Sequence, residues 1–147
     1  MRAGRDRMQI RSEPATMSGI RAMLKALRRG EAIGLLPDQV PDPGRGGEGA
    51  WADFFGRPAY TITLVQKFAK TTKALVVMIA CVRLPNAQGY RLIFSPLDAF
   101  SENPEAAARA LNAAVEAAIA LAPDQYLWSY NRYKVPGGLT TPNEASP

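Results

Sequence analysis

The segment Ala74-Leu-Val-Val-Met-Ile-Ala-Cys-Val-Arg-Leu84 decides the fold of this chain. It is an apolar run rich in Val and Ile, and its length and composition are typical of a central, buried β-strand. A turn over residues 85–89 follows, and Tyr90 to Ser95 form a second short strand. The two strands are expected to pair as a hairpin. Because Cys81 lies within the first strand, we expect it to be a small buried residue.

Helices are predicted on both sides of this hairpin. Apolar residues recur at three- and four-residue spacing from Thr16 to Arg29, which predicts a helix that Gly30 ends. Residues 59–72 show a similar spacing and predict a second helix. Downstream, Asn103-Pro-Glu105 is a strong helix start, because it places a cap, a proline and an early acid in order. This alanine-rich helix is expected to run to about residue 122.

The order of these elements predicts the fold class. Ala32 to Leu36 is a short apolar run that Pro37 ends, and it predicts a buried strand. With the helix predicted at 59–72 and the strand predicted at 74–84, it is expected to form a right-handed βαβ crossover. We therefore expect α/β architecture with a mixed, mainly parallel sheet flanked by helices.

Bulk properties limit the class of protein. The 147 residues suit one soluble domain, with 47% hydrophobic and 21% charged residues. A single cysteine excludes an internal disulfide. The longest apolar run, Ala74 to Val82, is too short to span a bilayer, for which about 20 residues are needed. No signal peptide is recognisable, since no apolar stretch follows the arginines of the first twelve residues.

The net charge of +5 lies entirely in residues 1–36, and the rest of the chain is balanced. Nucleic acid, anionic lipid head groups or an acidic protein would each complement such a segment, and a solvated basic face without a partner is the alternative. Aromatic residues between Tyr126 and Tyr133 alternate with basic ones, but no nucleic-acid-binding motif is present. No nucleic-acid partner is therefore expected.

Two groups of residues are candidates for a functional site. Asp38, in Pro37-Asp-Gln39, directly follows the strand predicted at 32–36, where open α/β sheets form their sites. The alternative is an aspartate that forms a turn or a cap. Trp51, Phe54 and Phe55 are suited to an acyl channel or a lipid contact, or else to an ordinary core.

The residue types also exclude some chemistry. The chain has no histidine and one cysteine, so a zinc site and a Ser-His-Asp triad are not expected. The glycine-rich run Gly44-Arg-Gly-Gly-Glu-Gly49 lacks the pattern of a phosphate-binding loop. It lies in a loop predicted over residues 37–53. Neither a metal nor an organic cofactor is predicted.

Several stretches, taken in order, resemble one protein family. The chain is similar to the downstream half of the lauroyl/myristoyl lipid A biosynthesis acyltransferases of Gram-negative bacteria, over most of residues 5–137. The matching stretches are Leu27-Arg-Arg-Gly-Glu-Ala-Ile-Gly-Leu-Leu-Pro-Asp-Gln39, Phe54-Phe-Gly-Arg-Pro-Ala-Tyr-Thr61, Gly89-Tyr-Arg-Leu92, and Pro123-Asp-Gln-Tyr-Leu-Trp128 followed by Asn131-Arg-Tyr-Lys134.

The resemblance implies an activity, partners and a location. A fatty acyl chain is moved from acyl-carrier protein to a lipid A precursor, at the cytoplasmic face of the inner membrane, beside an anionic membrane surface. The family's catalytic motif is a histidine followed five residues later by an acid, upstream of Pro37-Asp-Gln39. Residues 1–137 are then the C-terminal part of one acyltransferase domain, and residues 138–147 are a loose tail.

The resemblance also implies roles for individual residues. Arg7, or its neighbour Arg5, steadies the oxyanion or a lipid phosphate, and Asp38 is its partner or orients a catalytic group. Arg7 and Asp38 are the candidate catalytic residues. A solvated position on a basic arm is the alternative for Arg7. The candidate substrate-binding residues are Arg5, Gln39, Phe54 and Phe55.

The chain departs from the family at the catalytic motif, because it contains no histidine. Two interpretations follow. In the first, the chain is part of an acyltransferase whose proton acceptor lies on other polypeptide. In the second, it is a remnant or fragment without activity of its own, which should expose an apolar face where the missing half would pack.

Overall fold

The computed structural model describes residues 11–14 and 16–142. This part of the chain is mixed α/β, and it consists of α-helices, two antiparallel hairpins and short 3-10 turns. The bounds of the elements, in chain order, are α1 Met17–Arg28, β1 Gly49–Phe54, β2 Arg57–Ile62, α2 Leu64–Thr72, β3 Val77–Arg83, β4 Tyr90–Pro96 and α3 Pro104–Ala120.

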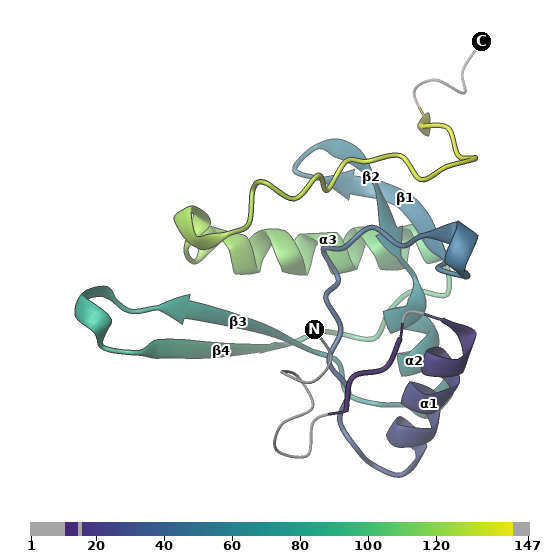
Figure 1. The fold of residues 1–147 in the computed structure, drawn as a ribbon, viewed down its shortest axis with the longest axis horizontal. Coiled ribbons are helices and arrows are strands. Elements are labelled where there is room, and N and C mark those ends of the chain that lie inside the picture. The colour runs from purple at the N-terminus through teal and green to yellow at the C-terminus, as the bar shows by residue number, and fades with distance from the viewer. Residues whose placement is uncertain (1–10, 15, 143–147) are drawn as a thin grey trace.

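Helix α3 organises the molecule. One of its sides packs on the β1–β2 hairpin and another on β3, while α1 and α2 lie together at one end (Figure 1). The core cluster joins Phe54 and Ala59 of the first hairpin to Val115 and Ile119 of α3. The β3–β4 hairpin extends away from this core, and the segment after α3 runs back across the β1–β2 side (Figure 1).

The predictions that rest on local signals are confirmed. Thr16 caps α1 by accepting a hydrogen bond from the Gly19 N–H, and Gly30 follows the helix with a φ of 79°. Asn103 caps α3 by accepting from the N–H groups of Glu105 and Ala106. The hairpin predicted from 74–84 and 90–95 forms, with Val77 opposite Pro96 and Arg83 opposite Tyr90.

The prediction of a mainly parallel sheet is wrong. Both sheets of the described residues are two-stranded and antiparallel, in the orders β1–β2 and β3–β4. The strand predicted at Ala32 to Leu36 is not assigned, and without it no βαβ crossover exists. A β-strand needs a neighbouring strand to satisfy its backbone groups, and no described segment pairs with residues 32–36.

The helix predicted at residues 59–72 is wrong at its start, over residues 59–63. Residues Arg57–Ile62 form strand β2, and only Leu64–Thr72 are helical. The loop predicted over 37–53 likewise ends early, since β1 begins at Gly49. The β-forming side chains of Tyr60, Thr61 and Ile62 pair across the hairpin, and this pairing outweighs an apolar spacing that also fits a helix.

The prediction that Cys81 is buried is also wrong, because the thiol is exposed. Strand β3 has a neighbour on one edge only and extends beyond the core, so an apolar sequence is not enough to bury it. Within the described residues, no helix combines the length and the hydropathy that a membrane span requires.

Candidate functional site

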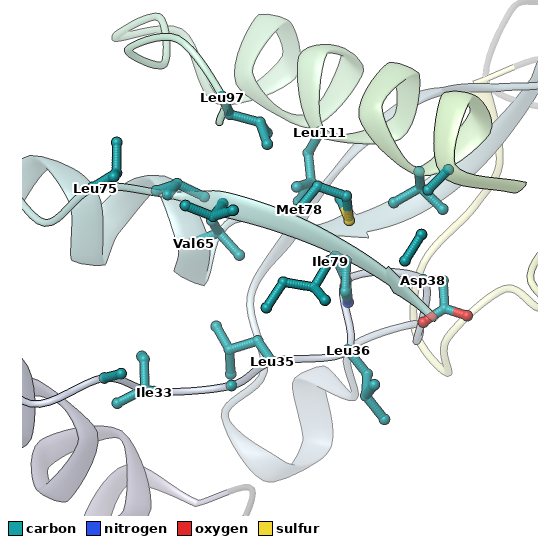
Figure 2. Close-up of a pocket in the computed structure, with 18 of the residues that line it drawn as sticks. Ile33, Leu35, Leu36, Asp38, Val65, Leu75, Met78, Ile79, Leu97 and Leu111 are labelled. Carbon is teal, nitrogen blue, oxygen red and sulfur yellow. The ribbon is translucent and has the colours of Figure 1, made fainter. Parts of the chain in front are cut away.

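Asp38 lies at the end of an apolar groove. The groove has a volume of about 790 Å³ and lies between the extended segment 32–38 and β3, with α2 and α3 behind it. Figure 2 shows the Asp38 carboxylate beyond Leu36, on the side toward which β3 runs. A half-buried carboxylate beside an apolar hollow is suited to orient a polar group against an apolar ligand.

Tyr126 holds this carboxylate in place. Its hydroxyl donates a hydrogen bond to Asp38 Oδ2 at 3.3 Å, and the 3-10 turn Pro123–Gln125 sets its position. Burial, together with the charge and hydrogen bond of Asp38, raises the pKa of Tyr126 to about 12. The phenol therefore stays protonated at neutral pH and keeps donating to Asp38.

The loop that carries Asp38 is tied to the segment after α3. The Val40 N–H donates to the Tyr130 hydroxyl at 2.8 Å, and Val40 itself is buried. Gln39 lies between these anchored residues, and its side chain is exposed. Tyr126 and Tyr130 thus fix both sides of the Pro37-Asp-Gln39 turn.

A row of aromatic rings connects Asp38 to the first hairpin. Tyr126 meets Trp128 edge-on with centroids 4.9 Å apart, and Trp128 lies 6.2 Å from Phe55. Phe55 in turn meets Phe54 at 4.8 Å. Trp128 is 58% exposed and Phe55 is 46% exposed, so the row presents apolar surface to the solvent.

Phe55 occupies an unusual backbone position. Phe55 and Gly56 connect β1 to β2, and both have positive φ angles, 47° and 72°. This is the pattern of a type I′ turn, which favours Asn or Asp followed by Gly. A bulky residue in the left-handed region is strained, and such strain is often kept at functional sites. The Glu116 carboxylate supports the turn by accepting from the Phe55 N–H at 2.9 Å.

A buried guanidinium joins the elements behind the row. Arg132 is only 3% exposed, and it donates to the Tyr60 carbonyl, to Thr61 Oγ1 and to Asn112 Oδ1 at 2.7–3.0 Å. Burial lowers the pKa of this group, while the charge of Asp38 acts in the opposite direction. Arg132 therefore connects β2, α3 and the C-terminal segment.

The structure brings only some of the candidate site residues together. Asp38 and Gln39 share one turn at the end of the groove, and Phe54 and Phe55 lie at the other end of the aromatic row. Phe54 is a core residue, 1% exposed, whereas Phe55 is accessible. Arg5 and Arg7 lie outside the described residues.

Sequence reasoning missed the residues that build this site, namely Tyr126, Tyr130 and Arg132. All three lie within or next to stretches that carry the family resemblance, which is the signal that could have found them. No set of His, Cys, Asp and Glu side chains in residues 11–14 and 16–142 has the arrangement of a metal site.

An apolar groove with an aspartate at its end and exposed aromatic rings beside it has the composition of a binding site for an apolar ligand. Comparison with known proteins identifies the family. The sequence description of the bacterial lipid A biosynthesis acyltransferases matches residues 2–135. The chain therefore belongs to the bacterial lipid A biosynthesis acyltransferase family.

Individual members of this family are similar to the chain. The lipid A biosynthesis palmitoleoyltransferase of Escherichia coli is 31% identical over 132 residues, which are 88% of this chain and 42% of that protein. The lipid A biosynthesis acyltransferase of Haemophilus influenzae is 33% identical over 114 residues, 78% of this chain and 35% of that protein. The lipid A biosynthesis lauroyltransferase of E. coli is 32% identical over 118 residues, 78% of this chain and 38% of that protein. The chain thus spans less than half the length of these relatives.

Proposed function

We propose that this chain is part of an enzyme that transfers a fatty acyl chain from acyl-carrier protein to a lipid A precursor. The proposed place of the reaction is the cytoplasmic face of the bacterial inner membrane. Family membership supports the reaction class, and the observation that carries the assignment to a site is the Asp38 carboxylate, held by Tyr126 at the end of an apolar groove.

The proposed reaction forms an ester and breaks a thioester. The acceptor hydroxyl oxygen attacks the thioester carbonyl carbon, and the resulting oxyanion collapses as the carrier thiolate leaves. The proton of the hydroxyl passes to a general base and then to the thiolate. Because this chain has no histidine, the base is proposed to come from polypeptide outside it, and Asp38 orients that base or its partner.

Two further parts of the chain have proposed roles. Arg7, with Arg5 beside it, stabilises the oxyanion or binds a phosphate of the lipid A precursor. Phe55 and Gln39 contact the substrate, and the exposed Trp128 extends the apolar surface beside them. Phe54 supports Phe55 from the core. The basic N-terminal segment is suited to acyl-carrier protein or to an anionic membrane surface.

A chimera tests this proposal, with the 147 residues replacing the matched region of the E. coli palmitoleoyltransferase. We expect the chimera to transfer acyl chains from acyl-carrier protein to a lipid A precursor. Asp38→Asn should lower kcat/KM about 100-fold or more, because a misplaced proton-transfer group costs at least that much. Arg7→Ala should also lower it, while Arg11→Ala should not.

Asp98→Asn is the matched control for Asp38, because Asp98 is exposed in the segment between β4 and α3. Both variants should keep the circular dichroism of the parent. An unchanged rate for Asp38→Asn in an active chimera would remove Asp38 from the site.

The second candidate is a chain without activity of its own, and the absence of histidine favours it. The isolated 147 residues are then expected to show no acyl transfer under conditions where the chimera is active. Turnover by the isolated chain would contradict this second candidate. An inactive but folded chimera would contradict the first.

A further inference from the structure

One edge of strand β3 is hydrogen-bonded to β4, and its other edge is open. The Leu97 N–H donates to the Val76 carbonyl at one end of the β3–β4 hairpin, and the Leu84 N–H donates to the Gly89 carbonyl at the other. Hydrogen-bonded pairs alternate along an antiparallel ladder, so Met78, Ala80 and Val82 direct their backbone groups toward β4. The residues between them, Val77, Ile79 and Cys81, direct theirs to the opposite edge.

The side chain of Gln125 already imitates a strand on this open edge. Its Oε1 accepts from the Arg83 N–H at 2.9 Å, and its Nε2 donates to the Arg83 carbonyl at 3.2 Å. Arg83 belongs to the same alternating set as Cys81, so these contacts identify the direction of the open edge. Within the described residues, β3 pairs with β4 alone, and the backbone groups from Val77 to Cys81 have no strand to meet.

A second extended segment faces this edge across the groove. Residues 32–36 have no strand partner among the described residues, and both they and β3 line the groove of about 790 Å³. In Figure 2, Met78 points toward α3, while Ile79 points toward Leu35 and the extended segment. Ile79, Leu36 and Leu75 remain 56%, 62% and 76% exposed, although all three are large and apolar.

We propose that this groove is the seat of an additional β-strand, supplied by the part of the family's polypeptide that has no counterpart in this chain. The strand pairs with the open edge at Val77, Ile79 and Cys81. It covers the apolar side chains of β3 on one side and those of segment 32–36 on the other. A strand of ordinary length, about five to six residues, meets these groups.

The choice of this occupant rests on two observations. First, the E. coli palmitoleoyltransferase has more than half of its length outside the matched region, since the match covers 42% of it. Second, an open strand edge needs hydrogen-bond donors and acceptors, which a polypeptide backbone provides and a hydrocarbon chain does not.

Cys81 provides a direct test, because it is exposed, lies on the open edge and is the only cysteine of the chain. The probe is the part of the E. coli palmitoleoyltransferase outside the matched region, produced as a separate polypeptide without cysteine and co-expressed with the 147-residue chain. We expect the two to co-purify and the rate of Cys81 alkylation by a maleimide to fall about tenfold or more. This readout does not depend on acyl transfer, so it can fail or succeed independently of the proposed function.

Two proline variants separate edge pairing from general damage to the hairpin. Ile79 and Phe94 lie directly opposite each other, and their N–H groups point to opposite edges of the hairpin. Proline at either position removes an outward N–H and leaves the β3–β4 ladder bonds in place. We expect Ile79→Pro to weaken binding of the probe about tenfold or more, and Phe94→Pro to leave it nearly unchanged.

The other occupants give different results. Co-purification with Cys81 still fully reactive would overturn the proposal, as would equal effects of the two proline variants. Protection of Cys81 in the chain alone, together with a dimeric mass, would assign the groove to a second copy. Protection by lauric acid micelles but not by the probe would assign it to an acyl chain. Either of these assignments would also overturn the proposal.

Discussion

Arg132 shows how a single residue holds the site region together. No carboxylate of the described residues bonds to its buried guanidinium, which donates instead to carbonyl, hydroxyl and amide oxygens of β2 and α3. Its Nε is buried without a hydrogen-bond partner among the described residues. Burying a cation in this way costs desolvation free energy. The hydrogen bonds of the guanidinium offset that cost only while all of them are made.

Arg132→Lys should therefore be strongly destabilising. A lysine has no forked donor group and cannot reach the three acceptors at once, so we expect a loss of about 2–4 kcal/mol in the free energy of unfolding. Urea denaturation followed by circular dichroism measures this loss. Arg57→Lys is the control, since Arg57 is exposed and its guanidinium lies over the Tyr133 ring at 4.2 Å. That change should cost less than about 1 kcal/mol. Equal losses in the two variants would show that the buried hydrogen bonds of Arg132 stabilise the chain no more than the exposed Arg57 does.

Because of Tyr126, the free energy of unfolding is expected to fall as the pH rises through the alkaline range. The folded-state pKa of about 12 lies above the ordinary value of 10.0. The unfolded chain therefore releases the phenol proton first, and the stabilisation is complete below pH 10 and lost as the pH rises toward 12. Because the ring is only half-buried, solvent screening reduces this contribution to about 1 kcal/mol.

Tyr126→Phe should accordingly lose less stability than the parent chain between pH 9 and pH 11. The difference between urea midpoints at these two pH values measures the effect, since lysines titrate alike in both proteins. Tyr90→Phe serves as the control because Tyr90 is 69% exposed. If the parent and Tyr126→Phe lose equal stability, the pKa of Tyr126 is not raised in the folded chain.

Among the secondary-structure elements, the β1–β2 turn has both a strained backbone and an exposed side chain at Phe55. Phe55 adopts a positive φ that its side chain disfavours, and its ring lies beside Trp128 rather than in the core. Comparing two substitutions isolates the strain, because Phe55→Leu and Phe55→Asn both remove the aromatic contacts. Only Asn suits the first position of a type I′ turn, so Phe55→Asn should be more stable than Phe55→Leu by about 1 kcal/mol.

Thermal unfolding of the two Phe55 variants provides this comparison. In the chimera described above, both should also transfer acyl chains more slowly than the parent, since both lack the ring that is proposed to meet the substrate. If either variant transferred acyl chains as fast as the parent chimera, the strained Phe55 would have no role in the reaction.

The elements also show what the sequence could predict. Helices α1 and α3 follow from caps and spacing that lie within the helices themselves, such as Asn103 before Pro104. The β3–β4 hairpin is equally local. Segment 32–36 has the composition of a strand, but whether it forms one depends on a partner that its own residues cannot reveal. The same holds for Cys81, whose exposure follows from the open edge of β3.

The site was predictable to a smaller extent. Asp38 was selected because it follows an apolar run, and in the structure it lies at the end of a groove. Its role in a reaction stays a prediction. The residues that position its turn lie far along the chain, since Tyr126 is 88 residues after Asp38 and Tyr130 is 90 residues after its partner Val40. No local pattern indicates such contacts, and only the ordered family stretches place the two regions in one protein. The roles of Arg5 and Arg7 stay predictions.

Across the whole molecule, one part of the described chain is well packed and the second hairpin is not. The first hairpin, α3 and the C-terminal segment share one core, in which the Tyr133 hydroxyl also donates to the Phe54 carbonyl at 2.8 Å. The second hairpin exposes Leu92 and Phe94 on one strand and Ile79 on the other. An apolar hairpin that is exposed in this way has surface left to bury, which agrees with the strand-binding groove proposed above.

The domain boundary proposed at residue 137 can be tested by truncation. Removing residues 138–147 should change the free energy of unfolding by less than about 0.5 kcal/mol, because Arg132, Tyr133 and the buried Pro136 all remain. Removing residues 132–147 takes away the buried guanidinium and the Tyr133 bond, and should leave the chain largely unfolded at 25 °C. Urea titrations of the two truncated chains compare them directly. A large loss on removing the last ten residues would move the boundary beyond residue 137, because those residues would then belong to the folded core.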